Sequence, residues 1–248
     1  MASATLQQAP DAPEKVNSFG RIVGVIFSPK ETFESISKRP TWLVPVILLC
    51  LAQSVVVAVY GQRVGWRGML EKQMGDNAQF QELRPAQQQE RIDMVMKYVS
   101  KIAYVQAIIG PFVGVLALAG IFWLIFNMAA GAKIGYRISL GVVSYALVPG
   151  ILGILLGVVI IYLKDPSTVD LQNLVASNAG AFLSSDSPKW LRPLRLVDVF
   201  LFWEMILLAM GFAAAAPKKL STGSAFAWIF GLWAIVVLCW AGIAAAVS

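Results

Sequence analysis

Histidine is absent from all 248 residues, and charged residues are scarce. Without an imidazole the chain lacks Ser–His dyads, histidine acid–base chemistry and nearly every kind of zinc site. Only 14% of the residues are charged, whereas soluble domains have about 25%. Hydrophobic residues make up 58% of the chain, and the mean hydropathy is +0.69. This imbalance predicts an integral membrane protein.

Cysteine is also rare. Cys50 and Cys239 each lie inside an apolar run, which predicts two small buried side chains rather than a disulfide or a metal site. The sequence contains no P-loop, no dinucleotide fingerprint and no zincin motif. The paired aspartates of presenilin-like proteases and the aspartate-rich signatures of membrane prenyl transferases are missing too. We therefore expect no enzyme, no cofactor and no metal.

Five long apolar stretches are present, at about 42–60, 104–131, 138–163, 196–216 and 225–247. Each has roughly the 20 residues that a helix needs to cross about 30 Å of hydrocarbon. The predicted fold is all-α, a transmembrane bundle of five spans. Residues 1–14 form a polar, disordered tail in this prediction, and residues 15–248 form a single membrane domain.

Two short amphipathic helices are predicted before the first span. In the first, apolar side chains recur at helical spacing with Asn17, Ser18 and Arg21 opposite, as expected of a helix on the membrane surface: Phe19, Ile22, Val23 and Ile26. The second should start at the capping-box sequence "SPKE" (residues 28–31). A further amphipathic helix, over 85–102, is predicted between the first two spans and runs into the second.

The orientation follows from the short loops. "AKIGYR" (132–137) and "PKKLSTGS" (217–224) carry basic residues and no acid, which favours the cytoplasmic side. With five spans this places the N-terminus in the cytoplasm and the C-terminus outside. The lipid bilayer is the first expected partner. No basic, aromatic-interleaved patch favours nucleic acid.

Glu204 is the most unusual residue, because it lies near the middle of the fourth predicted span. A charge at such a depth costs about 3 kcal/mol on insertion scales. Glu204 shares a helix face with the small residues Gly211 and Ala215, so it should point into the bundle. Asp198 lies near the interface of the same span.

The depth of Glu204 narrows its expected partners. Gln53 and Ser54 in the first span reach a similar level, and Tyr145 lies deeper but has a long side chain. Asn127 is near the inner rim and fits less well. We expect Glu204 to bond with Gln53, Ser54 or Tyr145. Two interpretations stay open: a protonated Glu204 joins two helices, or it gates a proton, cation or partner site.

Three pairs of glycines have the spacing that lets helices approach closely: Gly110–Gly114, Gly131–Gly135 and Gly153–Gly157. Packing within one bundle is the favoured interpretation. Homo-oligomerisation is the alternative.

The ordered motifs "FSPKETFESI" (27–36), "RPTWLVP" (39–45), "SYALVP" (144–149), "DPSTVDL" (165–171) and "LVDVFLFWEMILLAMG" (196–211) resemble the Yip1 domain family, especially its bacterial branch. The residues that carry this resemblance are Phe27, Ser28, Pro29, Phe33, Pro40, Trp42, Pro45, Pro149, Asp165, Pro166, Trp203 and Gly211.

The resemblance implies a five-helix bundle with a cytoplasmic N-terminus. Eukaryotic members are linked to vesicle trafficking, Rab GTPase binding and membrane shaping. This chain has only about 41 residues before its first span, which argues against GTPase binding. A bacterial plasma membrane is the expected location.

Two functional hypotheses follow. In the first, the chain is a non-enzymatic membrane protein that organises the bilayer or recruits partners, with the surface helix 16–27 as its working surface. In the second, it is a small transporter or channel that uses Glu204. A membrane enzyme is the weakest alternative.

Overall fold

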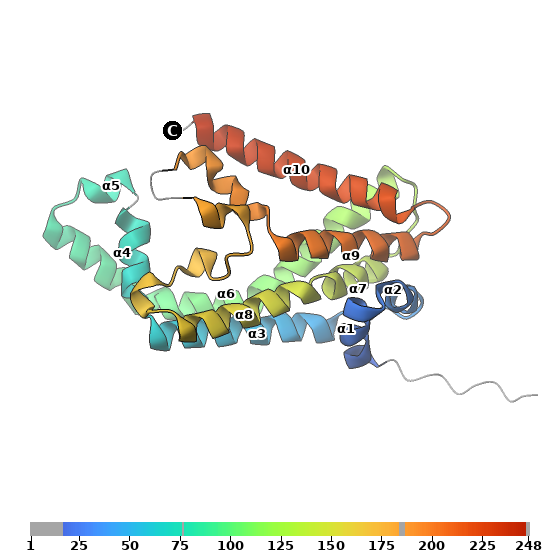
Figure 1. Cartoon of the computed structure of the whole chain (residues 1–248), viewed down its shortest axis with the longest axis horizontal. Coiled ribbons are helices and arrows are strands. Elements are labelled where there is room, and N and C mark those ends of the chain that lie inside the picture. The colour runs from blue at the N-terminus through green and yellow to red at the C-terminus, as the bar shows by residue number, and fades with distance from the viewer. Residues whose placement is uncertain (1–16, 76, 184–186, 247–248) are drawn as a thin grey trace, which may run out of the picture.

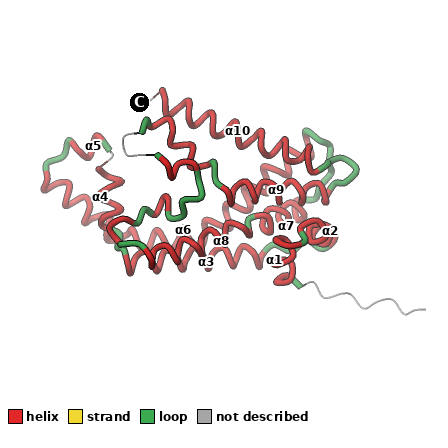
Figure 2. The backbone as a smooth tube through the Cα atoms, in the orientation of Figure 1, coloured by secondary structure: helices red, strands yellow, loops and turns green. Residues whose placement is uncertain are grey.

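The computed structural model describes residues 17–246, except for Asp76 and residues 184–186. This part of the chain is helical and contains no strand, as Figure 2 shows. The all-α prediction is therefore confirmed. The disordered tail that we predicted for residues 1–14 lies outside the described residues.

Four apolar segments are long enough to cross a membrane: α3 (Leu43–Arg63), α6 (Pro85–Met128), α7 with α8 (Tyr136–Ala146 and Val148–Leu163) and α10 (Thr222–Ala246). The fifth predicted span corresponds to α9 (Val199–Ala215), which has 17 residues. At 1.5 Å per residue its length is about 25 Å. Four segments rather than five therefore reach spanning length on their own.

The short helices gather at the two ends of the long ones (Figure 1). One end, here called the α2 end, contains α1 (Ser18–Phe27), α2 (Pro29–Lys38) and the turn 216–221. The other end, here called the loop end, contains α4 (Arg67–Gly75), α5 (Ala78–Gln81) and the connection 164–198. In its described residues this connection contains four 3₁₀ turns: η1 (Pro166–Thr168), η2 (Leu171–Asn173), η3 (Ala179–Phe182) and η4 (Lys189–Leu196).

The helix that we predicted over 85–102 is present and runs into the second span, as expected. These residues form the first part of α6, which has 44 residues and continues without a break into the second span. No glycine or proline lies between Pro85 and Gly110, so nothing in the sequence stops the helix. At 1.5 Å per residue α6 is about 66 Å long, roughly twice the hydrocarbon thickness. Its first turns pack with α4, and Arg67 bonds to Asp93 and, at 3.1 Å, to Gln89.

Pro149 divides the third apolar stretch. Proline has no N–H to donate to the carbonyl four residues earlier, here that of Tyr145. The helix accordingly ends at Ala146, Leu147 adopts ψ 1°, and α8 begins at Val148. Pro111, by contrast, lies inside α6 without interrupting it.

The core is densest at the α2 end. α2 packs against α7 and α9, and its Phe33 and Ile36 are fully buried. A methyl group added to Gly211 of α9 would overlap with Val142 and with the Phe33 ring, so α2, α7 and α9 meet at this glycine. α2 therefore packs onto the end of the bundle through its apolar face.

The Ser28 cap and one of the two cysteines differ from the prediction. α2 does begin at Pro29, but the Ser28 side chain makes no capping hydrogen bond; the Ser28 carbonyl accepts one from Thr32 Oγ1 at 2.8 Å instead. Cys50 is buried as predicted, whereas Cys239 is exposed on α10. α10 is the least buried of the long helices, so its apolar side chains face the surroundings rather than the core.

Candidate functional site: a cavity beside Glu204 and an exposed face of α1

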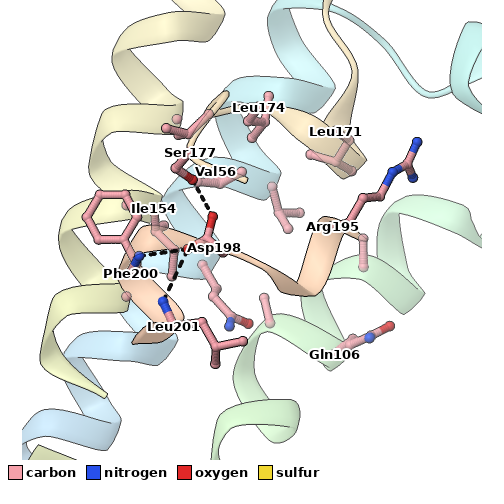
Figure 3. Close-up of a pocket in the computed structure, with 18 of the residues that line it drawn as sticks. Val56, Gln106, Ile154, Leu171, Leu174, Ser177, Arg195, Asp198, Phe200 and Leu201 are labelled. Atoms are coloured by element: carbon pink, nitrogen blue, oxygen red, sulfur yellow. Dashed lines mark hydrogen bonds between the residues drawn. The ribbon is translucent and has the colours of Figure 1, made fainter. Parts of the chain in front are cut away.

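The α9 helix borders a cavity of about 610 Å³. α3, α6 and α8 supply its other helical walls, and the connection 164–198 covers it at the loop end (Figure 3). Most of its wall is apolar, with Val56, Ile154 and Leu174 among the lining residues. A volume of this size is in the range of about 300–1,000 Å³ that small-molecule sites have.

Asp198 fixes the start of α9 at the edge of this cavity. One carboxylate oxygen accepts hydrogen bonds from the backbone N–H groups of Phe200 and Leu201, at 2.8 and 3.2 Å. The other accepts a hydrogen bond from the Ser177 hydroxyl. Ala179 N–H donates to the Val197 carbonyl at 2.9 Å on the same segment. Asp198 is thus the N-cap of α9 and ties the covering connection to it.

Glu204 lies one turn and a half further along α9 and points at α8. Its Oε1 occupies the space where a side chain at Gly150 would begin, so a methyl group there would clash with the carboxyl. Gly153 and Gly157 continue the same stripe of α8 and receive the Phe200 ring and Leu174. Glycine at these three positions therefore lets α9 and the connection lie directly on the α8 backbone.

The predicted partners of Glu204 are placed as follows. Gln53 lines the same cavity. The Ser54 hydroxyl donates to the Cys50 carbonyl of its own helix at 2.8 Å, and the Tyr145 hydroxyl lies 3.1 Å from Thr41 Oγ1 and 3.3 Å from the Ser18 carbonyl. Asn127 exchanges two hydrogen bonds with the backbone of Ile134 at the α6–α7 turn. Of the polar residues singled out in the sequence, Gln53 and Asp198 line the cavity with Glu204.

The glycine pairs differ in their surroundings. Gly153 and Gly157 contact side chains of this chain, which agrees with packing inside one bundle. Gly114 and Gly135 have no atom within 4 Å of an added Cβ. Gly131 adopts φ 59°, a left-handed conformation that glycine reaches without strain, and it belongs to the α6–α7 turn rather than to a helix contact.

The helix α1 is the second candidate site. Phe19, Val23 and Phe27 follow at intervals of four and are 66%, 58% and 79% exposed. Val25 is fully buried, and Ile22 and Ile26 pack against the core. The apolar residues that we placed on one membrane-facing side therefore divide between two faces.

Arg21 was predicted on the polar face of α1, and this is wrong. The residue is buried, and its guanidinium bonds to neutral oxygens: the carbonyls of Arg39 and Ser35 at 2.8 and 2.9 Å, and the hydroxyls of Thr41 and Ser35 at 3.0 and 2.7 Å. Five donors in a rigid fork suit this arrangement of acceptors. Arg21 fastens α1 to the end of α2 and to the segment that enters α3.

The residues that carry the family resemblance lie mainly where elements meet. Pro29 starts α2, Pro149 lies at the start of α8, and Asp165 caps the turn that begins at Pro166. Pro40 lies against Gly141 of α7, and Pro45 is buried in α3. Trp42 and Phe112 form a T-shaped pair, and Trp203 packs against the core. These residues therefore lie at the junctions between elements of this fold and do not gather in one active site.

A family model, the Yip1 domain, matches residues 23–243. The chain belongs to the Yip1 domain family. Together with its long apolar helices, this makes it an integral membrane protein. A search of curated proteins and a search of solved structures find no significant match.

Two parts of the site were not predicted from the sequence. Gly150 was missed although it lies three residues before the predicted pair Gly153–Gly157, and steps of three and four keep residues on one helix face. Ser177 and Arg195 come from an irregular connection, where no periodicity predicts which side chains turn inward.

Proposed function

We propose that this Yip1 family protein is a non-enzymatic membrane protein that organises the bilayer or recruits a partner through the exposed face of α1. The observation that supports this is an apolar stripe on a helix outside the long apolar segments. Phe19, Val23 and Phe27 expose rings and a branched chain that water solvates poorly. Insertion into the headgroup region, or burial by a partner, would remove that surface from water.

The contacts that attach α1 to the bundle support a fixed surface that binds the membrane or a partner, rather than a flexible tail. Arg21 and Val25 hold its other face against α2, α3 and α7. Because the helix is already formed and fixed, insertion of its exposed face costs no folding of a disordered segment. A wedge of this kind, confined to one leaflet, favours curved or loosely packed membranes.

We also propose that α9 crosses the membrane as a fifth span, with the N-terminus in the cytoplasm and the C-terminus outside. α9 packs alongside α10, and Figure 1 draws the end of α8 at the loop end and the start of α10 at the α2 end. A chain that passes from one end to the other through α9 needs a crossing there. The basic turns 132–137 and 217–224 support the cytoplasmic side for the α2 end.

The location in a bacterial plasma membrane belongs to the same proposal, as do the single membrane domain over 15–248 and a membrane-protein partner or second copy. Nucleic acid is not among the proposed partners.

Sorting on curved membranes tests the role of α1. Labelled full-length protein is reconstituted into giant vesicles, and its density is compared between the vesicle and a tube pulled from it. We expect enrichment on the tube, and loss of that enrichment for Phe19→Ser with Val23→Ser. Phe182→Ser is the matched control, because Phe182 is 88% exposed on η3 at the loop end. Equal enrichment of wild type and the double variant would rule out α1 as the curvature-sensing element.

Transport is the second candidate function, and the cavity beside Glu204 is the observation that favours it. A carboxyl group that borders a cavity of about 610 Å³ is placed to bind a proton or a cation. The test is ion flux in proteoliposomes with Glu204→Gln and, as a control, the exposed Glu90→Gln. Flux that survives Glu204→Gln would leave Glu204 with only its structural contact to α8.

A further inference from the structure

A second cavity, of about 660 Å³, adjoins the first at the loop end. The end of α3, the helix α4, the turns η1, η2 and η4, and α10 enclose it. Leu171 and Arg195 line both cavities, so the two share a wall. We propose that together they bind one anionic phospholipid, with an acyl chain in the first cavity and the phosphate headgroup in the second.

The two cavities follow one face of α3. Gln53, Val56 and Val57 line the first, and Tyr60 and Val64 line the second. Steps of three and four residues place all five side chains on one side of the helix. From Gln53 to Val64 the rise is about 16 Å at 1.5 Å per residue. The combined space is therefore elongated along the direction in which a lipid lies in a bilayer.

The character of the wall changes along this axis. The first cavity is mainly apolar, whereas the second brings together Arg192, Arg195, Asp170, Gln73, Ser167 and Thr168. Arg192 and Arg195 are three residues apart on a 3₁₀ helix, so their side chains leave it on the same side. Two guanidinium groups against one carboxylate leave a positive balance, and guanidinium donors match phosphate oxygens in pairs.

Arg195 connects the two cavities. Figure 3 shows its guanidinium directed away from Asp198 and beyond Leu171, although the stem of the side chain lines the first cavity. Its charged end thus leaves the apolar part of the space, as expected of a residue that meets a headgroup.

A route for a lipid exists on the side of α10. Trp240 lines the second cavity and is 44% exposed. Its neighbours Val236 and Ile243, one turn away on either side, are 50% and 65% exposed. A cavity that reaches the apolar surface of a membrane helix can take its ligand from the bilayer. Lipid binding at this place depends neither on α1 nor on the function proposed for it.

The test is native mass spectrometry of the full-length protein, delipidated in a nonionic detergent and titrated with phosphatidylglycerol, phosphatidylcholine of the same chains, or glycerol phosphate. We expect one bound phosphatidylglycerol with about tenfold preference over phosphatidylcholine, because both lipids offer a phosphate but only phosphatidylcholine brings a choline cation that the two guanidinium groups repel. Equal binding of the two lipids would overturn the proposal. Displacement of the lipid by glycerol phosphate at equal concentration would point to a soluble phosphate ligand instead.

Two variants locate the ligand. Arg192→Gln should remove the headgroup preference, while Arg91→Gln, an exposed arginine of α6 outside both cavities, should keep it. Ala103→Phe fills the first cavity from α6, so it should weaken long-chain phosphatidylglycerol and leave the dihexanoyl lipid unaffected. An unchanged melting temperature shows that each variant folds. If both folded variants bind like wild type, the lipid is not in these cavities.

Discussion

The α2 end and the loop end of this membrane protein are built in opposite ways. At the α2 end, Phe33, Ile36 and Phe212 are fully buried, and Gly211 leaves no room for a methyl group. At the loop end, 3₁₀ turns cover two cavities of about 610 and 660 Å³. Dense packing resists small changes, whereas a cavity allows side chains to move. The α2 end is therefore suited to hold α1 in place, and the loop end to admit a ligand.

Regular and irregular segments explain this contrast. α2, α6, α7 and α9 pack together at the α2 end, where the ring centroids of Phe126 on α6 and Phe212 on α9 are 4.6 Å apart. In the described part of the connection 164–198 no helix is longer than the eight residues of η4, and the connection is joined to α9 through Ser177 and Asp198. This cover consists of short turns, and η4 packs against α10.

The largest effect should come from removing the centre of the dense end. Phe33→Ala deletes a fully buried ring between α7 and α9 and should lower the free energy of unfolding by about 3–5 kcal/mol. Denaturant unfolding in mixed micelles measures it. Phe182→Ala at the loop end is the matched control, because its ring is 88% exposed and should matter little. Similar losses for both variants would mean that the two ends do not differ in packing.

Arg21→Met should have the next largest effect. It keeps the length of the side chain but leaves the carbonyls of Ser35 and Arg39 and the hydroxyl of Thr41 without their donor. The expected loss is about 3 kcal/mol, because hydrogen bonds to a charged donor are strong and the acceptors stay buried. α1 should also become more accessible, which limited proteolysis after residue 28 measures. Lys38→Met, an exposed cation at the end of α2, is the control and should leave α1 protected.

A pair of glycine variants compares the two ends directly. In Gly211→Ala the new methyl group meets Val142 and the Phe33 ring inside the core, which should cost about 1–3 kcal/mol. In Gly150→Ala it meets only the end of the Glu204 side chain, which can turn into the cavity, so we expect a loss below about 1 kcal/mol. Thermal unfolding of both variants in one detergent gives the difference. Equal destabilisation would show that the Glu204 carboxyl is held as rigidly as the core.

The sequence could predict those parts of the molecule that are periodic or capped. The apolar stretches predicted the long helices, and the patterns before the first span predicted α1 and α2. The amphipathic pattern over 85–102 predicted a helix that runs into the second span, and α6 has this continuity. Arg21 was misplaced because its acceptors are backbone carbonyls, which exist at every residue and leave no mark in the sequence. Both cavities depend on tertiary packing of an irregular connection.

The smallest effect is expected at Asp165, on the exposed surface of the loop end. Hydrogen bonds from the Ser167 hydroxyl and backbone N–H hold the pKa of Asp165 below its ordinary value of 3.8. A folded-state pKa below that of the unfolded chain gives stability that is present above the unfolded value and lost as the pH falls through the folded one. Asp165→Asn should therefore melt slightly below wild type at pH 6, and the two should converge below pH 4. Melting curves in a nonionic detergent measure this, and a difference that persists at low pH would mean that the carboxylate charge does not stabilise the turn.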